Sequence, residues 1–153
     1  MQVQQNVNDP LFERKVDFIT AGLPTGYAKR LKNENEVSRN SALIICNYIN
    51  SMKTEINLSD NYRGANIILL AKLSKFFKSR KSFDQITRED ILSFLDSLRK
   101  PETLDPLHKW VGTYNLYRIQ FIRFFKWLYS PHVEPGKRPK PPVIENIPKC
   151  CTC

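Results

Sequence analysis

The sequence lacks the features that mark membrane, secreted and β-sheet proteins. It contains no uninterrupted run of about 18 apolar residues, which excludes a membrane-spanning helix. Its first residues, MQVQQNVNDP, do not show the cationic and then apolar order of a secretory signal. Neither the alternating pattern of half-buried strands nor an internal repeat is present. The sequence therefore predicts an intracellular, all-α protein without a membrane partner.

Cysteine is too scarce and too unevenly placed for a disulfide framework. Of the 4 cysteines, Cys46 lies within an apolar helical pattern, whereas Cys150, Cys151 and Cys153 crowd the chain end. Adjacent cysteines fit tetrahedral zinc coordination poorly, and no second paired cluster occurs. We therefore expect Cys46 to be buried and the chain end to be unstructured, and we predict no metal site and no cofactor.

Acidic residues are missing from two long stretches, although the chain holds 15 of them against 24 lysines and arginines. None occurs between Asn61 and Phe83, and none occurs between Pro106 and Val133. The segment between these stretches is rich in acids. With a net charge of +9, this distribution favours a polyanionic partner, with nucleic acid before anionic lipid.

Apolar spacing predicts four helices, which form one helical domain over residues 34–131. The first follows Ser38 and ends near Asn57, and the second is capped by Ser59 or Asp60 and runs to about Ser79. The third starts at Thr87 with a capping box, and Pro101 stops it. The fourth runs from Thr113 until Pro131 terminates it.

The two flanking segments are predicted to be largely irregular. Residues 1–33 read as an arm with one short helix over Pro10–Thr20. Residues 132–153 form a proline-rich, basic tail, which is typical of an extended linker. The basic part of this tail either follows a DNA backbone or is a plain solvated linker.

The fourth predicted helix, TYNLYRIQFIRFFKWLY, carries only basic charges. At about 100° per residue, its polar and basic residues fall on one arc. Aromatic and aliphatic residues, Leu116 and Ile119 among them, occupy the rest of the circumference. We therefore expect a helix wedged among other helices that exposes a narrow cationic strip. The aromatic residues are expected in the core, and Trp110 is either a lid over it or exposed.

Two segments carry a resemblance to a known family. ITREDILSFLDSL and IQFIRFFKWLY resemble the third and fourth helices of the N-terminal core-binding (SAM-like) domain of tyrosine recombinases, the phage-integrase family, including its archaeal type. The resemblance covers Ser59–Pro131, with Ser38–Asn57 matching loosely. The sequence departs from the family pattern at Asn66, where the second helix usually carries an aromatic residue.

The resemblance implies a four-helix bundle that clamps duplex DNA through its second and fourth helices and serves DNA integration or site-specific recombination. The tyrosine nucleophile of the family and its supporting arginine, lysine and histidine residues belong to a separate domain, toward which residues 132–153 would lead. We expect that domain to be absent and the chain not to be an enzyme. The expected location is the cytoplasm, on the nucleoid, with other recombinase protomers as possible partners on DNA.

The candidate DNA-binding residues lie on or beside the two acid-free helices. They are Ser59, Asn61, Arg63, Lys72, Lys75, Lys78, Arg80, Lys81, Thr113, Asn115, Arg118, Arg123 and Lys126. For the lysines of the second helix, a solvated face is an equally good interpretation, and helix capping alone accounts for Ser59 and Thr113. Two rival functions stay open: a helical protein-interaction module whose basic face binds an acidic partner, and a small enzyme with an unrecognised site.

Overall fold

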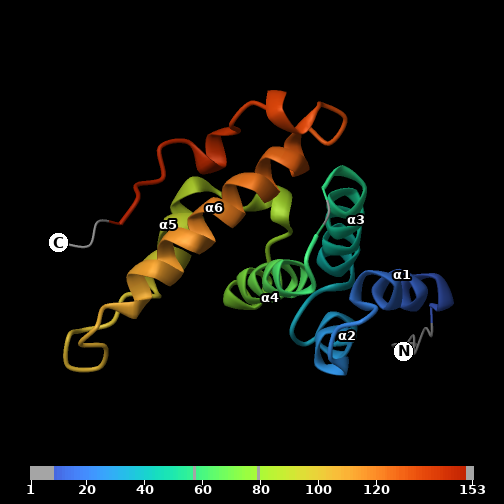
Figure 1. The fold of residues 1–153 in the computed structure, drawn as a ribbon, viewed down its shortest axis with the longest axis horizontal. Helices are drawn as coiled ribbons and strands as arrows, with labels where there is room; N and C mark the ends of the chain where they lie inside the picture. Colours follow the sequence, from blue (N-terminus) through green and yellow to red (C-terminus); the bar gives the residue numbers. More distant parts are fainter. Residues whose placement is uncertain (1–8, 57, 79, 151–153) are drawn as a thin grey trace, which may run out of the picture. The chain divides into compact units, whose positions relative to one another are not determined.

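The computed structural model describes residues 9–56, 58–78 and 80–150. The described residues form six α-helices and three short 3₁₀ helices, without a strand (Figure 1). This confirms the predicted all-α class. None of the helices in the described part of the chain has the length and apolar character needed to cross a membrane.

The chain divides into two compact units, residues 1–79 and residues 80–153. The division falls between the second and third of the four helices that the sequence predicts. Each unit is described by itself.

Unit 1 contains α1 (Pro10–Thr20), α2 (Thr25–Lys32), α3 (Arg39–Glu55) and α4 (Asp60–Phe76) (Figure 1). α1 packs against α2 and α3, and both α2 and α3 pack against α4. The residues that fill its core come from all four helices. Among them are Phe12, Ile19, Leu31, Ile45, Tyr48, Ile49, Ile67, Leu69, Leu70 and Leu73.

The prediction that residues 1–33 form a largely irregular arm is wrong in part, because the segment contains a second packed helix, α2, beside α1. The predicted helix over Pro10–Thr20 is confirmed as α1, with the Asp9 carboxylate capping its first turn. α2 is only 8 residues long and has no side-chain cap. A helix this short is held by tertiary packing rather than by local preference. Leu31 of α2 is buried, and Tyr27 of α2 lies against Gly64 of α4.

The helices α3 and α4 begin where the sequence predicts. Ser38 and Ser59 are their N-caps, and each serine hydroxyl accepts a hydrogen bond from a backbone N–H three residues later. Asp60 thus lies inside α4 as its first residue. α4 ends at Phe76, where Lys78 adopts a left-handed backbone (φ 53°). Phe76, the last residue of α4, is 42% exposed.

Unit 2 contains η1 (Phe83–Gln85), α5 (Arg88–Asp96), α6 (Lys109–Tyr129), η2 (Pro135–Lys137) and η3 (Pro142–Ile144). The predicted capping box of Thr87 and Asp90 at the start of α5 is confirmed. α5 ends before Pro101 is reached. Aromatic rings join these elements: Phe94 of α5 contacts Phe121 of α6 at 5.5 Å, and Phe83 contacts Phe124 at 5.1 Å between centroids.

α6 is 21 residues long and begins at Lys109, earlier than the predicted start at Thr113. The Asp105 carboxylate accepts a hydrogen bond from the Trp110 N–H at 3.0 Å and so satisfies an amide of the first turn. That bond lowers the pKa of Asp105, as does a second backbone bond from Lys109. The helix ends at Tyr129, as the proline at 131 predicts.

The described part of the proline-rich tail, residues 132–150, contains no α-helix, as predicted, but it is not a free linker. Its η3 turn packs against both α5 and α6, and the tail runs back beside them (orange to red in Figure 1). Val143, Ile144 and Ile147 are buried. Residues 143–150 are therefore part of unit 2.

Candidate nucleic-acid interface

The exposed side of α6 combines cationic and aliphatic side chains. Arg123 is exposed and Lys126 is half-buried. Leu116 and Ile119, which were expected to be buried, are 49% and 46% exposed on the same side of the helix. The remaining circumference is buried through Val111, Tyr114, Gln120, Phe121, Phe124, Phe125 and Trp127. We call Leu116, Ile119, Arg123 and Lys126 the α6 strip.

Two other predicted residues of α6 are occupied by the tail. The Arg118 guanidinium donates to the Ile147 carbonyl oxygen at 2.7 Å. The Asn115 side chain donates to the Cys150 carbonyl oxygen and accepts from the Cys150 N–H, both at 2.9 Å. In this structure Asn115 and Arg118 therefore bind the chain's own backbone.

Two further side chains hold the same segment. Arg88, at the start of α5, donates to the carbonyl oxygens of Glu145 at 2.7 Å and Asn146 at 2.8 Å. The Tyr114 hydroxyl donates to the Pro148 carbonyl oxygen at 3.1 Å. Burial raises the pKa of Tyr114, so its hydroxyl stays protonated at neutral pH. Neither Arg88 nor Tyr114 was predicted as a site residue, because contacts to a distant tail leave no local pattern in the sequence.

Arg138 was also missed. It is buried, and its guanidinium donates to the carbonyl oxygens of Ser130 at 3.0 Å and Pro131 at 3.3 Å. These contacts close the end of α6 and fix the first part of the tail. The sequence assigned this basic cluster either to DNA or to solvent, whereas the structure uses its arginine internally.

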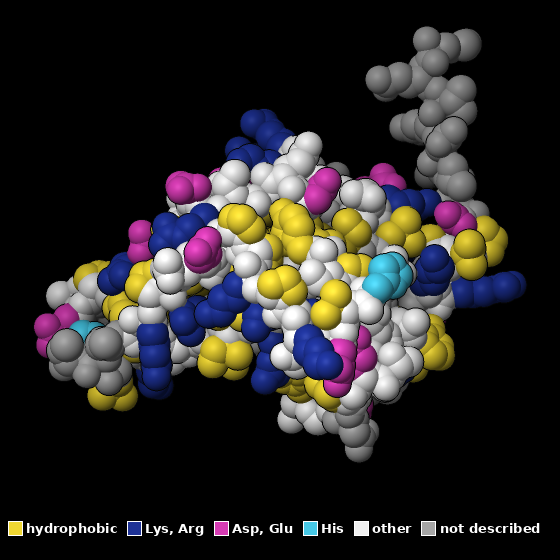
Figure 2. Space-filling view, turned by 90° about the horizontal axis from the view of Figure 1, so that it is seen from above, with side chains coloured by type: hydrophobic (Ala, Val, Ile, Leu, Met, Phe, Trp, Pro, Cys, Tyr) yellow, Lys and Arg dark blue, Asp and Glu magenta, His cyan; other side chains and the backbone are white. Residues whose placement is uncertain are grey.

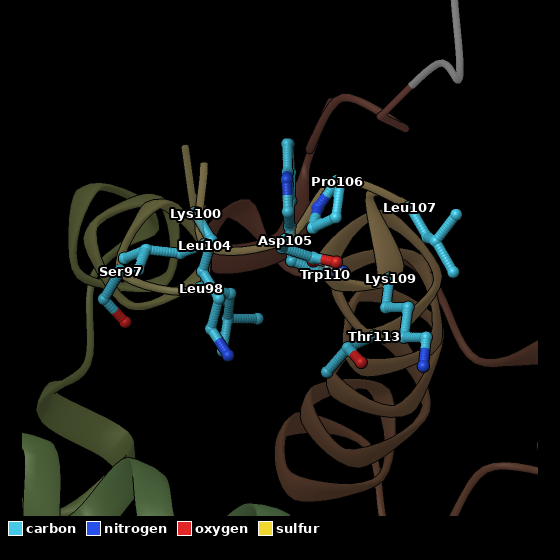
Figure 3. A pocket seen from close by; sticks show the side chains of 10 residues that line it. All are labelled: Ser97, Leu98, Lys100, Leu104, Asp105, Pro106, Leu107, Lys109, Trp110 and Thr113. Carbon is cyan, nitrogen blue, oxygen red and sulfur yellow. Dashed lines mark hydrogen bonds between the residues drawn. The ribbon is translucent and has the colours of Figure 1, made fainter. Parts of the chain in front are cut away.

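The remaining predicted residues of unit 2 have mixed surroundings. Lys81 is paired with Asp90 at 2.7 Å. Arg80 is exposed, and Thr113 is half-buried within α6. Thr113 borders a hollow of about 550 Å³ between the end of α5 and the start of α6 (Figure 3). Asp105 also lines this hollow, but its carboxylate is engaged at the helix start.

In unit 1, Arg63 is buried, and its guanidinium group is engaged within the protein. The side chain is 5% exposed, and its guanidinium donates to the Ile19 carbonyl oxygen at 3.0 Å and to the Asp60 carboxylate at 2.9 Å. The sequence analysis assigned Arg63 to a phosphate at the start of the helix. The structure assigns it instead to the contact between α4 and α1.

The other predicted residues of unit 1 lie on the outside of α4 and at its end. Ser59 and Asn61 are exposed in the first turn, and the Ser59 hydroxyl caps the helix. Lys72, Lys75 and Lys78 are exposed, and Lys75 lies 3.7 Å from Glu36. These lysines follow the predicted stripe. Since α4 and α6 belong to different units, a single wall formed by both helices stays a prediction.

Lysine and arginine side chains are spread among hydrophobic ones on the face shown in Figure 2. On this face the basic side chains are interspersed with hydrophobic and acidic ones (Figure 2). Within the described residues, no group of three or more His, Cys, Asp or Glu side chains is arranged to hold a metal ion.

The cysteine predictions have separate outcomes. Cys46 is buried on α3, as predicted, and burial raises its pKa to about 11. Cys150 is half-buried at the end of the tail, where its backbone binds Asn115. Cys151 and Cys153 lie outside the described residues.

We compared the chain with protein-family models, curated proteins and solved structures. No significant match was found in any of the three comparisons.

Proposed function

We propose that the chain binds duplex DNA through the phosphate backbone, with unit 2 supplying the main contact surface. The observation that carries this proposal is α6, which has 21 residues and no acidic one. Its strip presents Arg123 and Lys126 to solvent. Cationic side chains on such a surface bind phosphates and release condensed counterions, which is the main source of affinity in non-specific DNA binding.

The helix order and the two motifs support a more specific form of the proposal. The chain would act as the core-binding domain of an integrase-like tyrosine recombinase, with α3, α4, α5 and α6 as the four helices of that domain. α4 would add Lys72, Lys75 and Lys78 to the contact. We propose no chemistry for the chain itself, since binding alone is what these side chains support.

The proposal is tested by measuring affinity for a fluorescent DNA duplex as a function of NaCl concentration. Each phosphate contact contributes about 0.9 to the slope of log affinity against log salt. Replacing both Arg123 and Lys126 with alanine should therefore reduce the slope by up to about 1.8 units and weaken binding. The matched control is the double variant Arg14→Ala, Lys29→Ala, which removes two exposed charges from unit 1.

The two double variants separate a surface contact from a general charge effect. Equal losses in both would contradict a binding role for α6, because both variants lower the net charge by the same amount. Circular dichroism should show unchanged helicity, since all four substituted side chains are at least partly exposed.

One observation favours a second candidate, a protein-interaction module for an acidic partner. Leu116 and Ile119 are exposed within the α6 strip, and aliphatic side chains add affinity for proteins but not for phosphates. Absence of DNA binding at low salt, together with binding of an acidic polypeptide such as polyglutamate, would favour this function.

A further inference from the structure

The hydrogen bonds that hold residues 145–150 against α5 and α6 are all made to main-chain atoms of this segment. Its carbonyl oxygens at Glu145, Asn146, Ile147, Pro148 and Cys150 all accept hydrogen bonds from side chains of α5 or α6. The donors are Arg88, Tyr114, Asn115 and Arg118, which line one side of unit 2. We call residues 145–150 the strap.

The donors are chemically suited to a stronger acceptor than a carbonyl group. Arg88 and Arg118 carry full positive charges, yet within the described residues neither has a carboxylate within ion-pair distance. A phosphate carries the opposite charge that a carbonyl oxygen lacks, and it can accept two parallel hydrogen bonds from one guanidinium group. A row of phosphates would thus satisfy these guanidinium groups better than the strap does.

Two features of the strap set where it leaves the η3 turn and how its side chains contact unit 2: the backbone turn at Asn146 and the buried side chain of Ile147. Asn146 adopts a left-handed backbone (φ 53°), which turns the chain out of the η3 turn. Beyond that turn, Ile147 is the one buried aliphatic side chain among the described residues. Val143 and Ile144 precede the turn and are also buried. Displacing the strap would therefore remove Ile147, its one buried aliphatic side chain among the described residues, from the core.

We propose that the strap and the phosphate backbone of duplex DNA compete for Arg88, Asn115 and Arg118. The strap would then be an autoinhibitory segment of this chain that holds DNA affinity down until it is displaced. This inference rests on the proposed DNA-binding function. It also explains how Asn115 and Arg118 can be both predicted DNA contacts and occupied in the structure.

The test uses the full chain with Ile147→Ala, which weakens the anchor and leaves every donor in place. Releasing the strap should raise DNA affinity at least about threefold through a larger binding-competent fraction. It should also steepen the salt dependence by about 0.9 units for each guanidinium group that gains a phosphate. The matched control is Val133→Ala, at a tail valine that is 39% exposed and lies outside the strap.

Two additional measurements test whether a gain in affinity comes from release of the strap. The gain should disappear in the double variant Ile147→Ala, Arg118→Ala, because the freed guanidinium is then missing. In the wild-type chain, saturating DNA should increase amide hydrogen exchange within residues 145–150. Should Ile147→Ala reduce helicity, Tyr114→Phe replaces it, since that change removes only the bond to the Pro148 carbonyl oxygen.

The outcomes separate the two proposals. DNA binding by the wild type, with no gain in the variants and no change in exchange, would overturn the strap and leave DNA binding intact. No DNA binding by either protein at low salt would overturn the proposed function, and with it the competition.

Discussion

Arg63 illustrates how a single charged residue changes role once its surroundings are known. In the sequence it is a cation at the start of an acid-free helix, which favours a phosphate contact. In the structure its guanidinium binds the Ile19 carbonyl oxygen near the end of α1 and pairs with Asp60. A helix leaves its last carbonyl groups without partners, and Arg63 supplies one.

We predict that Arg63→Ala destabilises the protein by about 2 kcal/mol, because it leaves the Ile19 carbonyl oxygen without its charged donor. Urea unfolding followed by circular dichroism measures the change. Arg14→Ala, at an exposed position on α1, is the control and should have little effect. Unchanged stability together with a loss of DNA affinity would instead restore Arg63 to the DNA surface.

Cys46 gives a second prediction at the same scale. Burial raises the pKa of its thiol to about 11, so at pH 8 the thiol is protonated and shielded from reagents. Iodoacetamide should leave Cys46 unmodified in the native protein and modify it in urea, as read by peptide mass spectrometry. Rapid native labelling at this position would show that α3 opens readily or that the thiol is exposed.

At the scale of the element, the start of α5 is stabilised by hydrogen bonds among Lys81, Thr87 and Asp90. The Asp90 N–H donates to the Thr87 hydroxyl at 3.2 Å, and the Asp90 carboxylate accepts from the Thr87 N–H at 3.0 Å and from Lys81 at 2.7 Å. Burial raises the pKa of Asp90, but the bonds from Lys81 and Thr87 outweigh this effect and hold the pKa below its ordinary value.

The lowered pKa of Asp90 determines how the stability of the folded state changes with pH. Asp90 stabilises the folded state above its ordinary pKa of 3.8, and this stabilisation is lost as the pH falls through the lower folded value. Asp90→Asn should therefore reduce the free energy of unfolding at pH 7, and the difference from wild type should shrink below pH 3.8. Thr87→Ala should cost about 1 kcal/mol at pH 7 through loss of the helix cap. The exposed Glu89→Gln is the matched control, and an effect equal to that of Asp90→Asn would contradict the assignment.

The elements also show which features a sequence pattern can predict. Ser59 and Thr87 cap helices as predicted, because capping depends on residues three positions apart. The start of α6 was placed too late, since Asp105 reaches its first turn from a loop. α2 and the packed tail were missed because distant contacts, rather than local periodicity, hold them in place.

For the candidate site, periodicity identified the basic face of α6 but not what covers it. Arg123 and Lys126 are at least partly exposed, as predicted, whereas Asn115 and Arg118 bind the strap. Leu116 and Ile119 were wrongly placed in the core. A helix pattern gives the angle of each residue around the axis, but it does not say which arc meets a neighbour.

At the scale of the whole molecule, the two units suggest separate folding. The helices of unit 1 pack against one another, and all four contribute to its core. We predict that a fragment of residues 1–79 unfolds cooperatively in urea. A fragment of residues 1–58 is the control and should not, because it lacks α4 and the buried Ile67 and Leu70. A non-cooperative transition in the longer fragment would show that the units depend on each other.

The hydrogen bonds to the strap are made to its main-chain atoms, and this affects how freely its amino-acid sequence can vary in evolution. Any residue supplies a carbonyl oxygen, so replacements at Glu145 or Lys149 keep the same bonds. Selection would act on the spacing between the turn at Asn146 and the aliphatic residue that follows it. Related chains would then keep a strap of this kind although the amino-acid sequences of their straps differ.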